Sequence, residues 1–93
     1  MKSRTILSFA VAALAMTLAT AASAAPSCTN EPQSHWLSQT EMKARVAKMG
    51  YQKVKVFQVS GTCYEIYAYT RDGRRAEVYF NPVTGAIVEN NED

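Results

Sequence analysis

The sequence predicts an α+β fold in which one N-terminal helix packs on an antiparallel β-meander of three to four strands. Two observations predict this arrangement. Residues 38–50 combine helix-capping residues with apolar side chains at helical spacing, and residues 54–89 are rich in Val, Ile, Tyr and Phe. Short turns, each containing a glycine, divide the second stretch. Strands joined by short turns pair in chain order, so the predicted sheet is a meander.

Residues 1–24 have the pattern of an export signal peptide. Lys2 and Arg4 form a basic start, residues 6–20 are apolar, and residues 22–24 are the small residues that a signal peptidase requires. The apolar run of about 15 residues is shorter than the roughly 20 that a membrane span needs. We expect cleavage after Ala24, no membrane span after cleavage and a periplasmic or secreted domain, with an uncleaved anchor as the less favoured alternative.

Cleavage changes the charge of the chain. The full sequence has 10 Lys and Arg against 8 Asp and Glu, and the loss of Lys2 and Arg4 leaves eight of each. Nucleic-acid binding usually requires a basic stripe, because the phosphate backbone supplies most of the affinity. The near-neutral mature chain therefore predicts no nucleic-acid partner.

Two cysteines, Cys28 and Cys63, predict a disulfide, because an exported chain with an even cysteine count usually oxidises them. A bridge closing a loop of about 35 residues stabilises by roughly 3–4 kcal/mol. Redox or metal chemistry is the less favoured alternative, since the chain has no C-x-x-C pair.

Residues 25–37 predict an extended N-terminal arm, since they contain two prolines and few apolar side chains. The only histidine, His35, has no partner residues nearby in sequence for a metal or catalytic site. Trp36 is expected to cover one end of the core. The chain lacks a recognisable nucleophile–base pair, so we expect a non-enzymatic protein without catalytic residues, metal or cofactor.

The predicted helix, residues 38–50, has both ends marked in the sequence. Ser38 and Glu41 form a capping box, and Gly50 ends the helix in the left-handed conformation. Met42, Val46 and Met49 form the apolar stripe that faces the sheet.

Residues 63–80 predict a hairpin around Asp72-Gly73. A three-residue loop, Arg71-Asp72-Gly73, separates an apolar face from a polar one, whereas a two-residue loop would mix them. The apolar pairs are Tyr64 with Phe80, Ile66 with Val78 and Ala68 with Ala76. The polar-face pairs are Glu65 with Tyr79, Tyr67 with Glu77 and Tyr69 with Arg75.

The first strand, residues 54–59, has an imperfect alternation. A three-residue turn, residues 60–62, would pair Val56 with Ile66, Val54 with Ala68, Lys55 with Tyr67 and Phe57 with Glu65. A bulge near Gln58 is an alternative.

After residue 80, the stretch N-P-V-T-G predicts a turn, which places Phe80 opposite Ile87 on a short last strand, residues 86–89. Residues 90–93 form an acidic tail that we expect to fray.

The order of these elements resembles the PepSY domain, particularly its small exported form. The matching features are W-L-S-x-x-E at the helix start, the helix-ending G-Y, C-Y-E-I-Y-A, and R-D-G-R-R-A-E-V-Y-F-N-P-V-T-G-A-I-V, which together cover residues 36–88. Asn81 departs from the aspartate that the family commonly has before the proline. The resemblance implies a PepSY-like domain at 38–89 and a binding module related to the propeptides of secreted peptidases, with no catalytic residues to transfer.

The leading hypothesis is an exported, non-enzymatic PepSY domain that regulates a peptidase or another protein partner, with inhibition of the peptidase as one form of that regulation. The predicted partner-binding residues on the polar face are Phe57, Tyr67, Tyr69, Tyr79 and Lys55. The plainer alternative is that the tyrosines only favour strands, or that the arm covers them. A second class, suggested by the resemblance, is an accessory ligand-binding or redox-associated periplasmic domain that partners a membrane electron-transfer protein, although the spacing of His35 and the methionines gives it no support.

Overall fold

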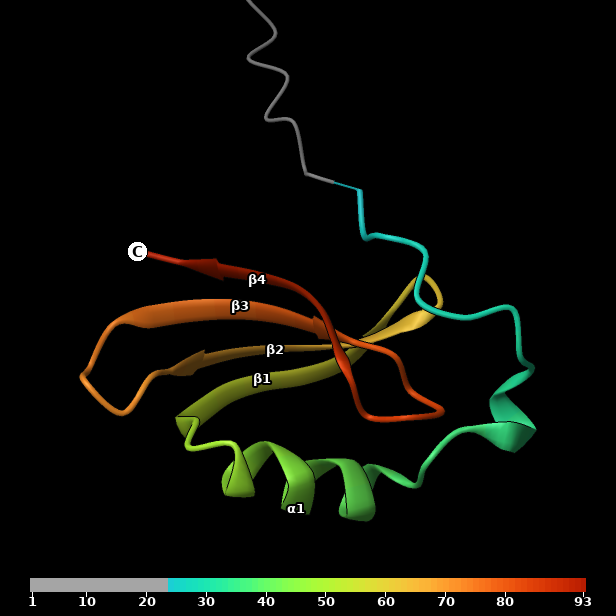
Figure 1. The fold of residues 1–93 in the computed structure, drawn as a ribbon, viewed down its shortest axis with the longest axis horizontal. Coiled ribbons are helices and arrows are strands. Elements are labelled where there is room, and N and C mark those ends of the chain that lie inside the picture. Colours follow the sequence, from blue (N-terminus) through green and yellow to red (C-terminus); the bar gives the residue numbers. More distant parts are fainter. Residues whose placement is uncertain (1–23) are drawn as a thin grey trace, which may run out of the picture.

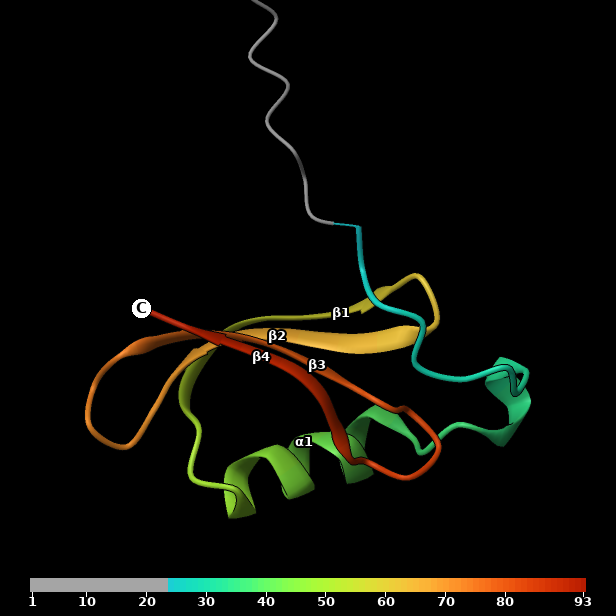
Figure 2. The same ribbon diagram turned by 45° about the horizontal axis from the view of Figure 1, so that its top comes forward.

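The computed structural model describes residues 24–93, so nearly all of the predicted signal peptide lies outside the described residues. The elements are η1 (Gln33–His35), α1 (Gln39–Lys48), β1 (Gln52–Ser60), β2 (Cys63–Tyr69), β3 (Arg75–Phe80) and β4 (Ile87–Glu92). The strands form one antiparallel sheet in the order β1-β2-β3-β4. Helix α1 lies across one face of this sheet (Figures 1 and 2). The α+β prediction is confirmed. Within the described part of the chain, no helix is long and apolar enough to cross a membrane.

Helix α1 begins and ends where the sequence predicts. The Ser38 hydroxyl accepts a hydrogen bond from the Glu41 amide at 3.1 Å, and Gly50 adopts a φ of 98°, which only glycine adopts easily. Met42 and Val46 are buried against the sheet. The prediction that Met49 is buried with them is wrong, because Met49 is the C-cap residue and lies at the end of the core, where it remains 41% exposed.

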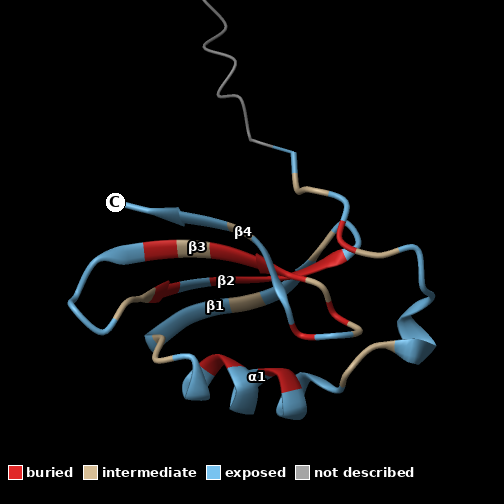
Figure 3. Ribbon diagram, viewed as in Figure 1, coloured by how far each residue is buried: buried red, intermediate tan, exposed pale blue. Residues whose placement is uncertain are grey.

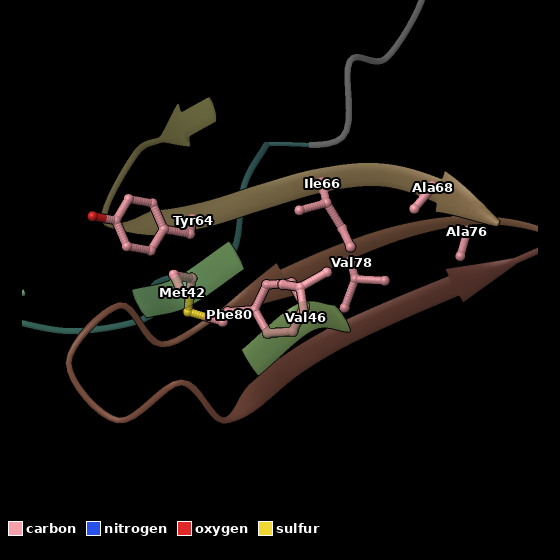
Figure 4. Close-up of a cluster of buried hydrophobic side chains, with 8 residues drawn as sticks. All are labelled: Met42, Val46, Tyr64, Ile66, Ala68, Ala76, Val78 and Phe80. Atoms are coloured by element: carbon pink, nitrogen blue, oxygen red, sulfur yellow. The ribbon is translucent and has the colours of Figure 1, made fainter. Parts of the chain in front are cut away.

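The core lies between α1 and the central strands β2 and β3, which are buried while β1 and β4 are largely exposed (Figure 3). Its members are Met42, Val46, Tyr64, Ile66, Ala68, Ala76, Val78 and Phe80 (Figure 4). Aromatic rings close both ends. Trp36 meets Tyr64 edge-on at 5.3 Å between centroids, and Tyr51 meets Phe80 at 6.5 Å.

The β2–β3 register is the predicted one at every pair, from Tyr64 opposite Phe80 to Tyr69 opposite Arg75. The three-residue loop is confirmed as well. The Thr70 amide donates to the Arg74 carbonyl at 2.8 Å, and Gly73 has a φ of 85°. This loop therefore fixes which side chains of the hairpin face α1.

The predicted β1–β2 register is wrong by one residue. Phe57 lies opposite Ile66 and Val56 opposite Tyr67, because the loop contains only Gly61 and Thr62. Gly61, with a φ of 59°, stands at the first turn position, where a two-residue type II′ hairpin needs glycine. The irregularity in β1 lies between Gln52 and Val56 rather than near Gln58.

The predicted pairing of Phe80 with Ile87 is confirmed, and β4 starts at Ile87, one residue later than predicted. In the turn before it, Asn81 Oδ1 accepts hydrogen bonds from the amides of Val83 and Thr84. The prediction that residues 90–93 fray is wrong, because β4 continues to Glu92, which pairs with Ala76. Salt bridges hold this end of the chain: Arg74 contacts Glu92 at 3.4 Å and Arg75 contacts Asp93 at 3.1 Å.

Candidate functional site

The face of the sheet opposite α1 is called here the outer face. The strand registers place on it Val56 and Gln58 of β1, Glu65, Tyr67 and Tyr69 of β2, Arg75, Glu77 and Tyr79 of β3, and Glu89 and Asn91 of β4. Since no helix of the described residues lies on this side (Figure 2), its exposure depends on the N-terminal arm.

The arm covers one end of the outer face. The disulfide between Cys28 and Cys63 is formed, with Cα atoms 5.1 Å apart, and the Cys28 amide donates to Thr62 Oγ1 at 2.8 Å. Tyr79 packs against this pair and is only 3% exposed. The bridge prediction is confirmed, and the predicted binding residue Tyr79 is a buried residue beneath the arm.

Glu77 is the centre of a hydrogen-bonded cluster on the outer face. Its carboxylate accepts hydrogen bonds from the Tyr67 hydroxyl at 2.8 Å, the Tyr79 hydroxyl at 3.3 Å and the Asn91 side-chain amide at 3.3 Å. The interaction with the neighbouring Glu65 carboxyl, followed by the hydrogen bond from Tyr67, holds the pKa of Glu77 below its ordinary value. The cluster therefore favours a charged carboxylate and fixes the orientation of Tyr67.

The same cluster raises the pKa values of its two tyrosines. The hydrogen bond to Glu77, with smaller effects of burial and of the nearby carboxylates, raises the pKa of Tyr67 to about 12. Burial, and then the neighbouring carboxylate of Glu65, raise the pKa of Tyr79 strongly. Both phenols are thus neutral hydrogen-bond donors across the physiological range.

Glu65, which the sequence predicts only as a polar-face residue, is a buried carboxyl. It is 2% exposed, and Gln58 donates to its Oε1 atom at 2.7 Å, while its Oε2 atom has no N–H or O–H donor from protein side chains or backbone within residues 24–93. It lies opposite Tyr79 and on the same strand as Cys63, near the end of the sheet that the arm covers. The one sequence signal that could have indicated its burial is its place two residues after the bridged cysteine.

The other end of the outer face is open. A hollow of about 400 Å³ lies there. Its polar and aromatic lining residues are Lys55, Tyr67, Tyr69, Arg75, Glu77, Asn91 and Asp93. Tyr67 is 41% exposed, and Val56 beside it is 37% exposed. Lys55, Tyr67 and Tyr69 are three of the five residues predicted to bind a partner, and the structure brings them together.

Phe57 does not belong to this surface. The corrected register places it on the α1 side, where its ring lies 5.1 Å from that of Tyr64 and 5.2 Å from Lys43 Nζ. The prediction that it lies on the polar face is therefore wrong, because the loop after β1 is one residue shorter than expected. Whether any of the predicted residues binds a partner stays a prediction.

His35 lies on the exposed arm, where its Nδ1 atom contacts Glu31 Oε2 at 2.6 Å. Across the described range 24–93, no three or more His, Cys, Asp and Glu side chains are grouped so that they could hold a metal ion.

The chain was compared with known protein families, curated proteins and solved structures. The family model described as "Peptidase propeptide and YPEB domain" (PepSY_2) matches residues 8–91 of the 93 residues. No curated protein matches the chain. No solved structure matches it either. The family match covers most of the chain, and it agrees with the helix and meander described above, so this protein belongs to the PepSY family of peptidase propeptide and YPEB domains.

Proposed function

We propose that this protein is an exported, non-enzymatic binding domain that regulates a peptidase through the open end of its outer face. PepSY domains are generally non-catalytic propeptide or regulatory domains, which supports the class of function. The observation that carries the proposal is the surface formed by Lys55, Tyr67 and Tyr69 around a hollow at the open end of the outer face.

The composition of this surface suits a protein interface. Interfaces are enriched in tyrosine and arginine at their centres, and both occur here as Tyr67, Tyr69 and Arg75. Tyr67 is also held in place, because its hydroxyl donates to Glu77 at 2.8 Å. A side chain that is already ordered loses less conformational entropy when a partner binds, so Tyr67 is the expected anchor.

Two features support export. Residues 1–24 have the composition of a signal peptide, and the Cys28–Cys63 bridge is of a kind that persists in oxidising compartments. The mature domain would then work in the periplasm or outside the cell. Its partner would be a peptidase of the same compartment or a membrane-associated protein.

The experiment is capture of partners from a periplasmic extract on the immobilised disulfide-bonded protein, followed by affinity and peptidase-inhibition measurements with the captured protein. The double variant Tyr67→Ala, Tyr69→Ala should weaken binding by at least about tenfold, which is about 1.4 kcal/mol. Ile87→Ala is the matched control, because Ile87 is a similarly exposed apolar residue whose register places it on the α1 side. Equal affinities for the double variant and the wild type would refute this surface, provided that circular dichroism shows both to be folded.

A further inference from the structure

Charge is distributed unevenly over this nearly neutral domain. Residues 39–60, which contain α1 and β1, carry five basic residues and one acidic residue. Residues 24–38 and 61–93 carry three basic and seven acidic residues. The two parts therefore have opposite net charges of equal size, and the α1–β1 side is the positive one.

A groove lies between α1 and the edge strand β1 on this positive side. It has a volume of about 480 Å³ and is lined by Lys43, Val46, Ala47, Tyr51, Val54 and Phe57. The floor is apolar, and no Asp or Glu belongs to the lining. The ammonium group of Lys43 lies 5.2 Å from the centre of the Phe57 ring, so the only charge in the groove is positive.

The edge of the sheet beside this groove is unpaired. Within the described sheet, β1 pairs only with β2, and its pairing is regular from Val56 to Ser60. Ser60 and Cys63 flank a two-residue loop and form a hydrogen-bonded pair, so alternation directs the backbone groups of Phe57 and Val59 away from β2. The side chains of these two residues lie on the α1 side of the sheet, as their partners Ile66 and Tyr64 do.

From these observations we propose that an acidic, extended segment of a partner protein adds to the free edge of β1 as a fifth strand. Its backbone would bond to the outward groups of Phe57 and Val59, and the side chain opposite Phe57 would enter the groove beside Lys43. The neighbouring side chains would lie on the outer face, where Lys55 stands. A strand that alternates apolar and acidic residues would place its apolar side chains in the groove and its acidic side chains on the outer face near Lys55. This site rests on the α1–β1 groove and shares only Lys55 with the surface around Tyr67 and Tyr69.

Lysines and bulges on an edge strand also serve to prevent unwanted pairing. In β1 the irregular part lies between Gln52 and Val56, which leaves the run that borders Phe57 and Val59 regular. The positive charges repel a basic strand and attract an acidic one, so they select a partner as well as exclude others. An experiment can separate these two roles of the lysines. If the lysines only prevent strand pairing, an acidic strand should not bind to β1, whereas selection of a partner predicts that it binds.

The test uses the full disulfide-bonded protein and a fluorescein-labelled peptide of alternating Glu and Val, with a Lys–Val peptide of the same length as the peptide control. Lys43→Glu should weaken binding of the Glu–Val peptide about tenfold. Lys48→Glu is the matched protein control, because it makes the same charge change on the same helix outside the groove lining, and it should weaken binding less than about threefold. Equal losses in the two variants would mean that only net charge matters and would overturn the proposal.

Amide hydrogen exchange separates strand addition from simple charge attraction. Bound Glu–Val peptide should slow exchange of the Phe57 and Val59 amides, while the Gln58 amide, already directed towards β2, should change little. Binding without this protection, or no binding above the Lys–Val peptide, would overturn the proposal. Val59→Pro should also reduce binding of the Glu–Val peptide, since proline removes the backbone N–H of residue 59 that points away from β2. Proline is tolerated at such an edge position.

Discussion

Removal of the Cys28–Cys63 bridge is expected to remove a large part of the stability of this domain. The bridge joins residues 35 apart in sequence. Closing a loop of that length lowers the entropy of the unfolded chain by an amount worth about 3.8 kcal/mol at room temperature. A domain of this size has a net stability of only about 4–10 kcal/mol. The double variant Cys28→Ala, Cys63→Ala should therefore lose about 3–4 kcal/mol in urea unfolding, and its Tm should fall by about 15–30 °C.

A control separates the bridge from the docking of the arm. Thr62→Ala removes the hydrogen bond from the Cys28 amide but keeps the disulfide, and it should cost only about 1 kcal/mol. A loss below about 1 kcal/mol in the double cysteine variant would refute the chain-entropy argument. A loss equal to that of Thr62→Ala would show that the arm stabilises the fold through its contacts alone.

Three further predictions follow from single residues. Gly73→Ala should cost about 1 kcal/mol in urea melts, because its φ is 85° and no atom lies within 4 Å of an added Cβ, so the cost is conformational; a neutral effect would contradict this. Tyr79→Ala should lower the free energy of unfolding by about 3 kcal/mol, whereas Tyr67→Ala should lower it by no more than about 1 kcal/mol. Equal losses of stability in the two variants would show that the arm does not bury Tyr79. The pKa of Tyr67 in the folded state is raised from 10.0 to about 12, so its hydrogen bond to Glu77 stabilises the fold fully below pH 10 and this stabilisation is lost as the pH rises towards 12. Phenolate absorbance should show the late titration of Tyr67. Loss of the late titration in Glu77→Gln would identify the hydrogen bond to Glu77 as its cause.

The register of the hairpin from Cys63 to Phe80 could be predicted at every pair, because one loop length alone separates apolar from polar side chains on both strands. The first strand could not. This strand has apolar residues at positions of both faces, namely Val54, Val56, Phe57 and Val59. The alternation of apolar and polar residues therefore fits more than one register. Gly61 carried the missing information, since a glycine at the first position suits a two-residue loop.

The candidate site was predicted in part for the same reason. Tyr67 and Tyr69 come from the secure hairpin and lie where the sequence places them, whereas Phe57 moved with the register error. The burial of Tyr79 depends on where the arm crosses the sheet, and a cysteine pair indicates a contact without giving the path of the chain between. The tail of β4 was missed because Arg74 and Arg75 bind its acids from another strand, which a local reading of polar residues does not detect.

The disulfide also determines where a single cut of the backbone would separate the chain into two covalently unlinked pieces. Between Cys28 and Cys63 lie η1, α1 and β1, so one cut anywhere in that stretch leaves both pieces in a single covalent molecule. One cut in the turn after Tyr69 lies outside the loop and leaves β3 and β4 attached only by the sheet and the core. The domain can therefore be cut once along its helix or first strand and still migrate as one band without reductant. A single cleavage in the exposed turn around Asp72 therefore leaves two of the four strands, β3 and β4, without a covalent link to the rest of the domain.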